Sequence, residues 1–286
     1  MDDILQVNHL FKSYGDFQLK DVSFRMEKGT IMGFVGENGA GKTTTIKSIL
    51  NLIERDHGSI QVFGMDNIEQ EGRIKEQIGV VFDETYFHGN LRAADIGRIH
   101  KNIFRSWDQP LFEGYLKKFR LPSNKMIKDY SRGMKMKLSI ATALSHHPKL
   151  LILDEPTSGL DPVVRNEILD IFLDFIQDEE HAILFSSHIT SDLEKIADYI
   201  TFIHEGQVVF SESKDELLYQ YGVLKCGEEE FRTLSRSDYI GYNHNRFGYE
   251  VLIKDKNRIA RKNPDAVIDN VTVEDIILYY VKGEAK

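Results

Sequence analysis

One stretch of this sequence decides its fold, and it runs Gly36-Glu37-Asn38-Gly39-Ala40-Gly41-Lys42-Thr43. It satisfies the pattern Gly-x-x-x-x-Gly-Lys-Ser/Thr at every fixed position, and Thr44 follows it directly. In such a loop the glycines let backbone N–H groups close around phosphates. The lysine reaches the β- and γ-phosphates, and the final hydroxyl can hold Mg²⁺. The stretch therefore predicts a nucleotide-binding loop that uses Lys42 and Thr43.

The sequence on either side of this loop supports the prediction. Residues 29–35 form a short apolar run of the kind found in buried strands, and residues 44–52 carry apolar side chains at helical spacing. The loop should therefore join a strand to the N-terminus of a helix, whose dipole favours phosphate. A chance match in an ordinary glycine turn would not need this context, so we favour the nucleotide site.

Composition limits the class of protein. The 286 residues allow one large α/β domain with an appendage, or two small domains. The formal net charge is −9, so no global basic field favours nucleic acid, and we expect protein partners instead. The single cysteine, Cys226, cannot form an intramolecular disulfide, which is typical of a reducing compartment. No apolar run approaches the roughly 18 residues of a membrane-spanning helix, and we expect no direct membrane span.

Hydrophobic patterns predict a mainly parallel α/β core with additions. Residues 4–28 alternate with period two around a turn, which predicts a small antiparallel sheet before the loop. Continuous apolar runs, typical of parallel strands buried on both faces, occur at 78–82, 150–153, 182–185 and 199–203. Between residues 91 and 147 the pattern is helical and predicts a helical insertion.

The character of the chain changes after about Tyr221. Residues 222–286 mix polar stretches with a strand candidate and a closing amphipathic helix, which Thr272 is placed to cap. We therefore predict a nucleotide-binding domain over residues 1–221, with a helical subdomain at about 86–147, and a small α+β accessory segment over 222–286.

A second chemical feature is a pair of acids, Asp154 and Glu155, at the end of the apolar strand that begins at Leu150. Because side chains alternate along a strand, the two carboxylates should point in different directions. Asp154 can help to fix Mg²⁺ through its water shell, and Glu155 can orient or deprotonate the attacking water. The alternative is a solvated strand end. His188 closes another such strand, where a histidine is more often an ordinary surface residue.

These motifs, in this order, resemble the ATP-binding subunit of ATP-binding-cassette (ABC) transporters over roughly residues 2–220. The resemblance implies a P-loop NTPase core in which the glycine-rich loop is the Walker A motif. It implies that Glu155, at the end of the Walker B strand, is the catalytic base, and that His188 is the switch histidine that contacts the γ-phosphate. Tyr14, otherwise a common turn residue, falls at the position that stacks on adenine. Asp161 falls in the D-loop, which communicates across a nucleotide-sandwiched dimer.

Two motifs depart from the common family form. The signature Leu-Ser-Gly-Gly-Gln appears as Tyr-Ser-Arg-Gly-Met at residues 130–134. Ser131 and Gly133 are kept, and the resemblance implies that they meet the γ-phosphate held by the opposite subunit. This variant resembles those of multidrug, peptide and bacteriocin-immunity exporters. Where the family carries the Q-loop glutamine, this chain has Asp83, which can still accept Mg²⁺-bound waters.

The resemblance implies an ATPase that uses ATP and Mg²⁺, pairs with a second ATPase subunit, either identical or a paralogue, and drives a separate integral membrane subunit. That subunit would export a drug, peptide or similar substrate, and its coupling helix would contact the region around Tyr86 and Phe87. The chain would be cytoplasmic, on the inner face of the membrane. The expected site residues are, for catalysis, Lys42, Glu155 and His188; for nucleotide, Tyr14, Gly36, Glu37, Asn38, Gly39, Ala40, Gly41, Lys42, Thr43, Thr44, Ser131, Gly133 and Asp161; for metal, Thr43, Asp83 and Asp154.

Two other interpretations stay open at this point. One is a soluble ABC-type ATPase that acts on ribosomes or DNA, although such proteins commonly carry two cassettes, and this chain has one and is acidic. The other is a nucleotide-dependent regulatory module with little hydrolysis, which Asp83 in place of glutamine would favour.

Overall fold

A six-stranded sheet forms the centre of the computed structural model, which describes residues 3–284. Residues 1–2 of the predicted nucleotide-binding domain and residues 285–286 of the predicted accessory segment lie outside the described residues. The strand order is β10-β9-β3-β8-β7-β6, and every neighbouring pair is parallel except β9 with β10. The strands are β3 (Ile31–Val35), β6 (Ile78–Val81), β7 (Leu150–Asp154), β8 (Ala182–Ser187), β9 (Tyr199–His204) and β10 (Gln207–Ser213).

Helices cover this sheet, which is why its inner strands are apolar throughout. Every residue of β3, β7 and β8 is buried. Helix α1 (Lys42–Ile49) packs on β7, and α7 (Thr190–Ile196) packs on β3 and β8. Helix α6 (Pro162–Phe175) contributes buried aromatic and aliphatic side chains to the same core. The predicted mainly parallel α/β fold is confirmed.

The N-terminal part forms the predicted antiparallel sheet, in the order β2-β1-β4-β5. Strands β1 (Asp3–Tyr14) and β2 (Phe17–Glu27) meet at the expected turn, where Tyr14 pairs with Phe17. Strand β4 (His57–Val62) pairs antiparallel with β1, and the short β5 (Met65–Asp66) completes the sheet.

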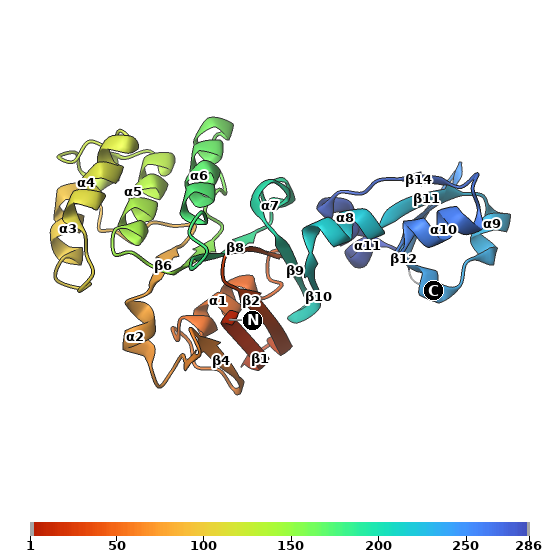
Figure 1. Ribbon diagram of the computed structural model, residues 1–286, viewed down its shortest axis with the longest axis horizontal. Helices are drawn as coiled ribbons and strands as arrows, with labels where there is room; N and C mark the ends of the chain where they lie inside the picture. Colours follow the sequence, from red (N-terminus) through yellow and green to blue (C-terminus); the bar gives the residue numbers. More distant parts are fainter. Residues whose placement is uncertain (1–2, 285–286) are drawn as a thin grey trace.

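The helical part lies at one end of the elongated molecule and the accessory segment at the other (Figure 1). It contains α3 (Ala93–His100), α4 (Gln109–Lys118), a 3₁₀ turn (Ile127–Asp129) and α5 (Arg132–Leu144), preceded by α2 (Glu71–Lys75). Helix α3 ends at His100, and Phe104 lies just beyond it. The rings of Phe104 and His146 are stacked, with their centroids 4.0 Å apart.

The accessory segment holds more regular structure than its sequence pattern indicated. It is an antiparallel sheet in the order β12-β13-β11-β14 with short helices around it. Its elements are β11 (Gly222–Cys226), α9 (Glu228–Thr233), a 3₁₀ turn (Arg236–Asp238), β12 (Tyr239–Asn245), β13 (Gly248–Ile253), α10 (Lys256–Lys262), β14 (Val267–Asp269) and α11 (Val273–Lys282). Helix α8 (Lys214–Gln220) leads into it from the core.

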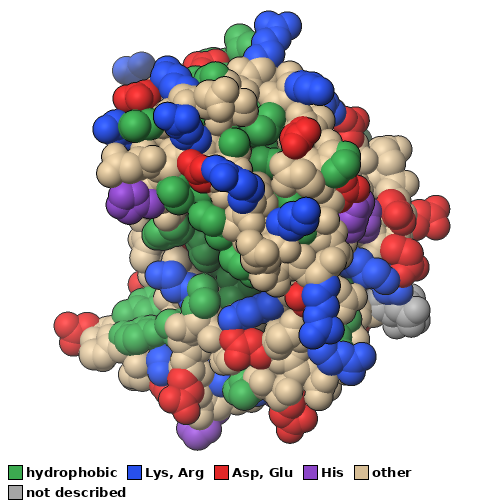
Figure 2. All heavy atoms as spheres, turned by 90° about the vertical axis from the view of Figure 1, so that its left-hand side faces the viewer, with side chains coloured by type: hydrophobic (Ala, Val, Ile, Leu, Met, Phe, Trp, Pro, Cys, Tyr) green, Lys and Arg blue, Asp and Glu red, His purple; other side chains and the backbone are tan. Residues whose placement is uncertain are grey.

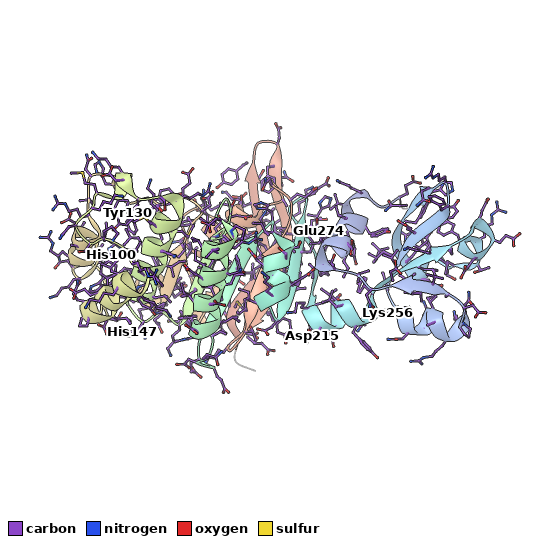
Figure 3. All side chains as sticks on the ribbon, turned by 90° about the horizontal axis from the view of Figure 1, so that it is seen from above. His100, Tyr130, His147, Asp215, Lys256 and Glu274 are labelled. Atoms are coloured by element: carbon purple, nitrogen blue, oxygen red, sulfur yellow. The ribbon has the colours of Figure 1, made fainter. Side chains whose placement is uncertain are left out.

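Helix α11 returns from the accessory segment to the core. Thr272 caps it as predicted, because its hydroxyl accepts a hydrogen bond from the N–H of Asp275 at 3.1 Å. The N–H of Val273 donates to a carboxylate oxygen of Glu194 on α7 at 2.6 Å. Glu274 lies where the accessory segment meets the core (Figure 3). The domain boundary near residue 221 stays a prediction. Within residues 3–284, no helix has the length and apolarity needed to cross a bilayer.

Core packing predicts how stability responds to truncation of one aromatic side chain. Phe172 on α6 is fully buried and meets Phe185 on β8 edge to face, with the ring centroids 5.8 Å apart. We expect Phe172→Ala to lower the free energy of unfolding by about 3–5 kcal/mol, because it leaves a cavity. Urea unfolding followed by circular dichroism measures the change. The control is Phe247→Ala, at a side chain that is 83% exposed, which should change it by less than about 0.5 kcal/mol. Equal effects of the two substitutions would contradict this account of the core.

Candidate active site

The glycine-rich loop runs from the end of β3 to the start of α1, and its backbone needs its glycines. Gly41, which precedes the first residue of α1, has a φ of 115°, a left-handed value that residues with a Cβ rarely adopt. A Cβ on Gly36 would lie 2.3 Å from the carbonyl oxygen of Ile203, so the loop packs tightly against β9 at that point. The loop is thereby fixed at the N-terminus of a helix, where anionic phosphate is favoured.

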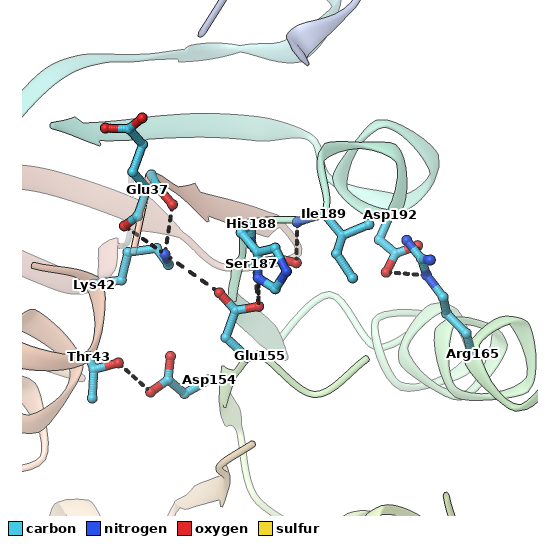
Figure 4. A network of polar contacts seen from close by, with 11 residues as sticks. Glu37, Lys42, Thr43, Asp154, Glu155, Arg165, Ser187, His188, Ile189 and Asp192 are labelled. Carbon is cyan, nitrogen blue, oxygen red and sulfur yellow. Dashed lines mark hydrogen bonds and ion pairs between the residues drawn. The ribbon is translucent and has the colours of Figure 1, made fainter. Parts of the chain in front are cut away.

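Lys42 is buried at the base of this loop. Its ammonium donates to the carbonyl oxygen of Gly36 at 2.7 Å and to that of Glu37 at 3.2 Å. It also lies 3.5 Å from Oε1 of Glu155. The cation therefore stands between the loop backbone and the second carboxylate of the predicted pair, as Figure 4 shows.

Asp154 is the carboxylate that fits a role at a metal ion. Its Oδ2 accepts a hydrogen bond from the hydroxyl of Thr43 at 2.9 Å. Its Oδ1 is buried and has no hydrogen-bond partner in the described part of the chain. A buried carboxylate oxygen without a donor is suited to a water bound to Mg²⁺. No group of three or more His, Cys, Asp or Glu that could hold a metal occurs within residues 3–284, so ligands from phosphate and water would complete such a site.

Glu155 points away from Asp154 and forms a pair with His188. Nδ1 of His188 lies 2.6 Å from Oε2 of Glu155, and the His188 backbone N–H donates to the same oxygen at 3.3 Å. Because a carboxylate can only accept, Nδ1 donates in this pair. Glu155 has a φ of +54°, a costly conformation for a residue with a side chain, of the kind that clusters at functional sites. Its Oε1 has no hydrogen-bond donor among the described residues and faces Lys42.

A cleft of about 440 Å³ brings most of the predicted residues together. It is lined by Phe17, Glu37, Asn38, Gly39, Gly41, Lys42, Thr43, Thr44, Asp83 and Glu155. Asp83, at the predicted Q-loop position, therefore shares one space with Lys42. Ala40 is buried beneath the loop, and its carbonyl accepts from the N–H of Gly206 at 3.0 Å.

The aromatic residue that lines this cleft is Phe17, whereas Tyr14 does not line it. Tyr14 is 47% exposed at the β1–β2 turn, with the ammonium of Lys12 at 5.2 Å from the centre of its ring. Phe17 packs near Gly41, since a Cβ added there would lie 3.1 Å from its ring. The sequence analysis missed Phe17, although the alternation of β2 places it on the same face as buried Leu19.

Three predicted residues lie at helix N-termini outside this cleft. Ser131 caps α5 by accepting from the N–H of Met134 at 3.2 Å, and Gly133 lies in the first turn of that helix. Asp161 caps α6, where its carboxylate accepts from the N–H groups of Val163 and Val164. Ser131 and Asp161 are exposed, so their predicted roles require a second subunit, and they stay predictions.

An apolar groove of about 390 Å³ lies beside the cleft. Figure 2 shows its hydrophobic side chains in a hollow on the end face of the molecule. The aromatic side chains that line it are Phe82, Tyr86, Phe87 and Phe104. Burial lowers the pKa of both histidines in its wall, His100 and His146, so both are neutral at pH 7.

The phosphate loop, the buried carboxylate beside Thr43 and the Glu155–His188 pair define a P-loop nucleotide hydrolase. The family model for ABC transporters matches residues 19–158. The chain is 36% identical over 212 residues to the bacitracin transport ATP-binding protein BcrA of Bacillus licheniformis, covering 73% of this chain and 69% of that protein. It is 36% identical over 215 residues to the lantibiotic transport ATP-binding protein SrtF of Streptococcus pyogenes, covering 74% and 92%. The chain therefore belongs to the ABC transporter family, as one of its ATP-binding proteins, and it is an ATPase.

A solved structure supports the same assignment. The ATP-binding subunit of an ABC transporter superimposes with a TM-score of 0.69 at 28% sequence identity, covering 75% of this chain and 91% of that one. The interpretation as an ABC transporter ATP-binding subunit is thus confirmed.

The position of Lys42 predicts the effect of its removal. We expect Lys42→Ala to weaken ATP binding about tenfold to a hundredfold, because charge-assisted hydrogen bonds are worth roughly 1.5–3 kcal/mol. Titration calorimetry with ATP and Mg²⁺ measures the dissociation constant. Lys47→Ala is the control, since Lys47 lies on the same helix but does not line the cleft. Unchanged ATP affinity in Lys42→Ala would remove Lys42 from the phosphate site.

Proposed function

We propose that this chain binds ATP with Mg²⁺ in the cleft at Lys42 and hydrolyses it to power export of a drug, peptide or similar substrate by a separate membrane subunit. The observation that carries the proposal is the convergence of the phosphate loop, Asp154 and the Glu155–His188 pair at one edge of the sheet. The class of substrate is suggested by relatives named for bacitracin and lantibiotic transport. The Ser-x-Gly-Met form of residues 131–134 favours the same class.

Each residue of the cleft has a chemical task in this proposal. The loop amides and Lys42 would hold the phosphates, and Thr43, Asp154 and Asp83 would hold Mg²⁺ with its bound water. Bound Mg²⁺ would neutralise charge that develops on the phosphate oxygens. Glu155 accepts a proton from the water that attacks the γ-phosphorus, and ADP leaves as its bond to that phosphorus breaks. His188 holds the Glu155 carboxylate and contacts the γ-phosphate.

Completion of this site needs a second subunit. Ser131, Gly133 and Asp161 line no part of the cleft in their own chain, and Ser131 and Asp161 are exposed. In a head-to-tail dimer of this chain, or of this chain with a paralogue, they would face the nucleotide of the other subunit. ATP would then join the two subunits, and hydrolysis would separate them.

The apolar groove is where we place the membrane partner. Tyr86 is 75% exposed and Leu52 is 52% exposed at its rim, and its two histidines are neutral. An amphipathic helix of the membrane subunit would bury its apolar face there. The segment from Phe82 to Phe87 lies between the groove and the cleft, because Asp83 lines the cleft while Tyr86 lines the groove. Docking there would place the chain on the inner face of the membrane.

Substitution of Glu155 tests the proposed function. We expect Glu155→Gln to keep ATP affinity within about threefold but to lower turnover at least a hundredfold, because general-base catalysis contributes roughly 10²–10⁴. Light scattering should then show an ATP-dependent shift from monomer to dimer with Mg²⁺ and none with EDTA. Asp154→Asn should raise the Mg²⁺ concentration needed for that shift. Steady-state hydrolysis equal to that of the unsubstituted chain would eliminate Glu155 as the base.

The groove can be tested by photocrosslinking in cells. We expect a photoreactive phenylalanine at position 86 to crosslink to an integral membrane protein, identified by mass spectrometry of the membrane fraction. The control is position 219, where Tyr219 on α8 is 68% exposed but lies away from the groove. Crosslinks to the same membrane protein from both positions, or from position 219 alone, would contradict the placement of the partner.

A further inference from the structure

An ion pair between a buried carboxylate and a partly exposed guanidinium joins α6 to α7 close to the Glu155–His188 pair. The side chain of Asp192, on α7, is 1% exposed. Its two oxygens accept hydrogen bonds from Nε of Arg165, on α6, at 2.7 and 2.8 Å. Arg165 also donates from Nη2 to the hydroxyl of Ser191 at 3.3 Å. Figure 4 shows this pair next to the segment that carries His188.

Such a pair is a poor means of stabilising two packed helices. Removing the Asp192 carboxylate from water costs several kcal/mol, and apolar side chains of similar size often pack as well or better. A fixed carboxylate–guanidinium contact does set the relative position of its two helices, because its hydrogen bonds depend on direction. Asp192 and Arg165 therefore suit a need for precise placement.

The group that this contact places is His188. Helix α7 begins at Thr190, so only Ile189 separates it from the histidine. The link is short and held at both ends. The Ile189 N–H donates to the hydroxyl of Ser187 at 2.9 Å, and the Asp192 N–H donates to the Ile189 carbonyl at 3.2 Å. A rotation of α7 would therefore move the imidazole that donates to Glu155.

Arg165 is also hydrogen-bonded to Asp161, the predicted D-loop residue. The Arg165 N–H donates to the carbonyl of Asp161 at 3.0 Å, one turn earlier in the chain. Asp161 caps the same helix with its side chain. The first turn of α6 thus carries both the residue expected to face the second subunit and the arginine that holds α7.

We propose that Arg165 and Asp192 are positioning residues for ATP hydrolysis: they lock α7 against α6 and thereby hold His188 on Glu155. The same contact ties the position of Asp161 to that of His188. This inference rests on the proposed roles of Glu155 and His188, and it adds two residues that do not line the cleft.

The direct test measures the His188 ring. In the full-length chain labelled with ¹⁵N-histidine, His188→Ala assigns the His188 resonance, and Glu155→Gln shows its position once the carboxylate is lost. Asp192→Asn and Arg165→Gln should move the resonance toward the Glu155→Gln position. A His188 resonance unchanged in both variants would overturn the proposal, whatever their stability. This readout does not require the chain to turn over ATP on its own.

Kinetics provide the second arm. We expect Asp192→Asn to lower kcat about tenfold to a hundredfold and to change KM for ATP less than threefold, because a 1 Å displacement of a catalytic group can cost about 10². Arg165→Lys, which keeps the charge, should retain more activity than Arg165→Gln. In a His188→Ala background Asp192→Asn should cause no further loss, since it acts through the histidine. If Asp192→Asn lowered kcat in the His188→Ala background by the same factor as in the unsubstituted chain, the loss would be structural damage and the positioning role would fail.

Controls separate this inference from the proposed function. Asp238 in the accessory segment forms another ion pair, with Arg258, and its side chain is 8% exposed. Asp238→Asn should destabilise the chain without changing kcat or the His188 resonance. If His188→Ala leaves kcat unchanged, the proposed catalytic role of His188 fails. If His188→Ala lowers kcat while Asp192→Asn and Arg165→Gln do not, only the positioning role fails. If Asp192→Asn does not fold, the comparison of Arg165→Lys with Arg165→Gln tests the positioning role instead. Arg165 is partly exposed, so its substitution should be better tolerated.

Discussion

The register of three parallel strands is the constraint on which the rest of this structure depends. Val35, the last residue of β3, pairs with Ser187 on β8, and Asp154, the last residue of β7, pairs with Ser186. The residues that follow these strand ends are the phosphate loop, His188 and Glu155. Because the carboxyl ends of parallel strands meet at one edge of a sheet, the aligned ends bring a cation, an acid and an imidazole together. A shift of one residue in either pair would turn the side chains that follow to the opposite face.

The backbone conformation just after β7 fixes the direction of the Glu155 carboxylate. The positive φ of Glu155 turns its carboxylate away from Asp154 and toward His188 and Lys42. The Glu155 N–H is held by the carbonyl of Ser186 at 3.0 Å, so the turn is anchored to the neighbouring strand. Two adjacent acids can therefore do different work, one beside the hydroxyl of Thr43 and the other beside an imidazole. The left-handed backbone of Glu155 therefore separates the two carboxylates.

Much of this could be predicted because it depends on local patterns. The phosphate loop, the apolar strands and the acids at the end of β7 are contiguous in sequence, and each follows from spacing and side-chain chemistry. Phe17 and the Arg165–Asp192 pair were missed, because each depends on contacts between segments far apart in the chain. The region around Tyr86 and Phe87 was expected as a contact surface, but the groove there was not, since distant segments form its walls. The accessory segment gave one clear strand signal, that of β13. Strands β11 and β14 are shorter, with five and three residues, and the last three residues of β12 are all exposed, so alternation is weak there.

Helix α7 is the point where several of these long-range contacts meet. On one side the buried Asp192 holds Arg165 of α6. On another side Glu194 accepts from the N–H of Val273, and Thr190 donates to Glu274 at 3.3 Å, so the start of α11 is bound to the same short helix. The carboxylate of Glu194 lies at the N-terminus of α11, where a negative charge is favoured. A helix of seven residues has little stability of its own. The position of α7, and with it that of His188, therefore depends on its contacts with both α6 and α11.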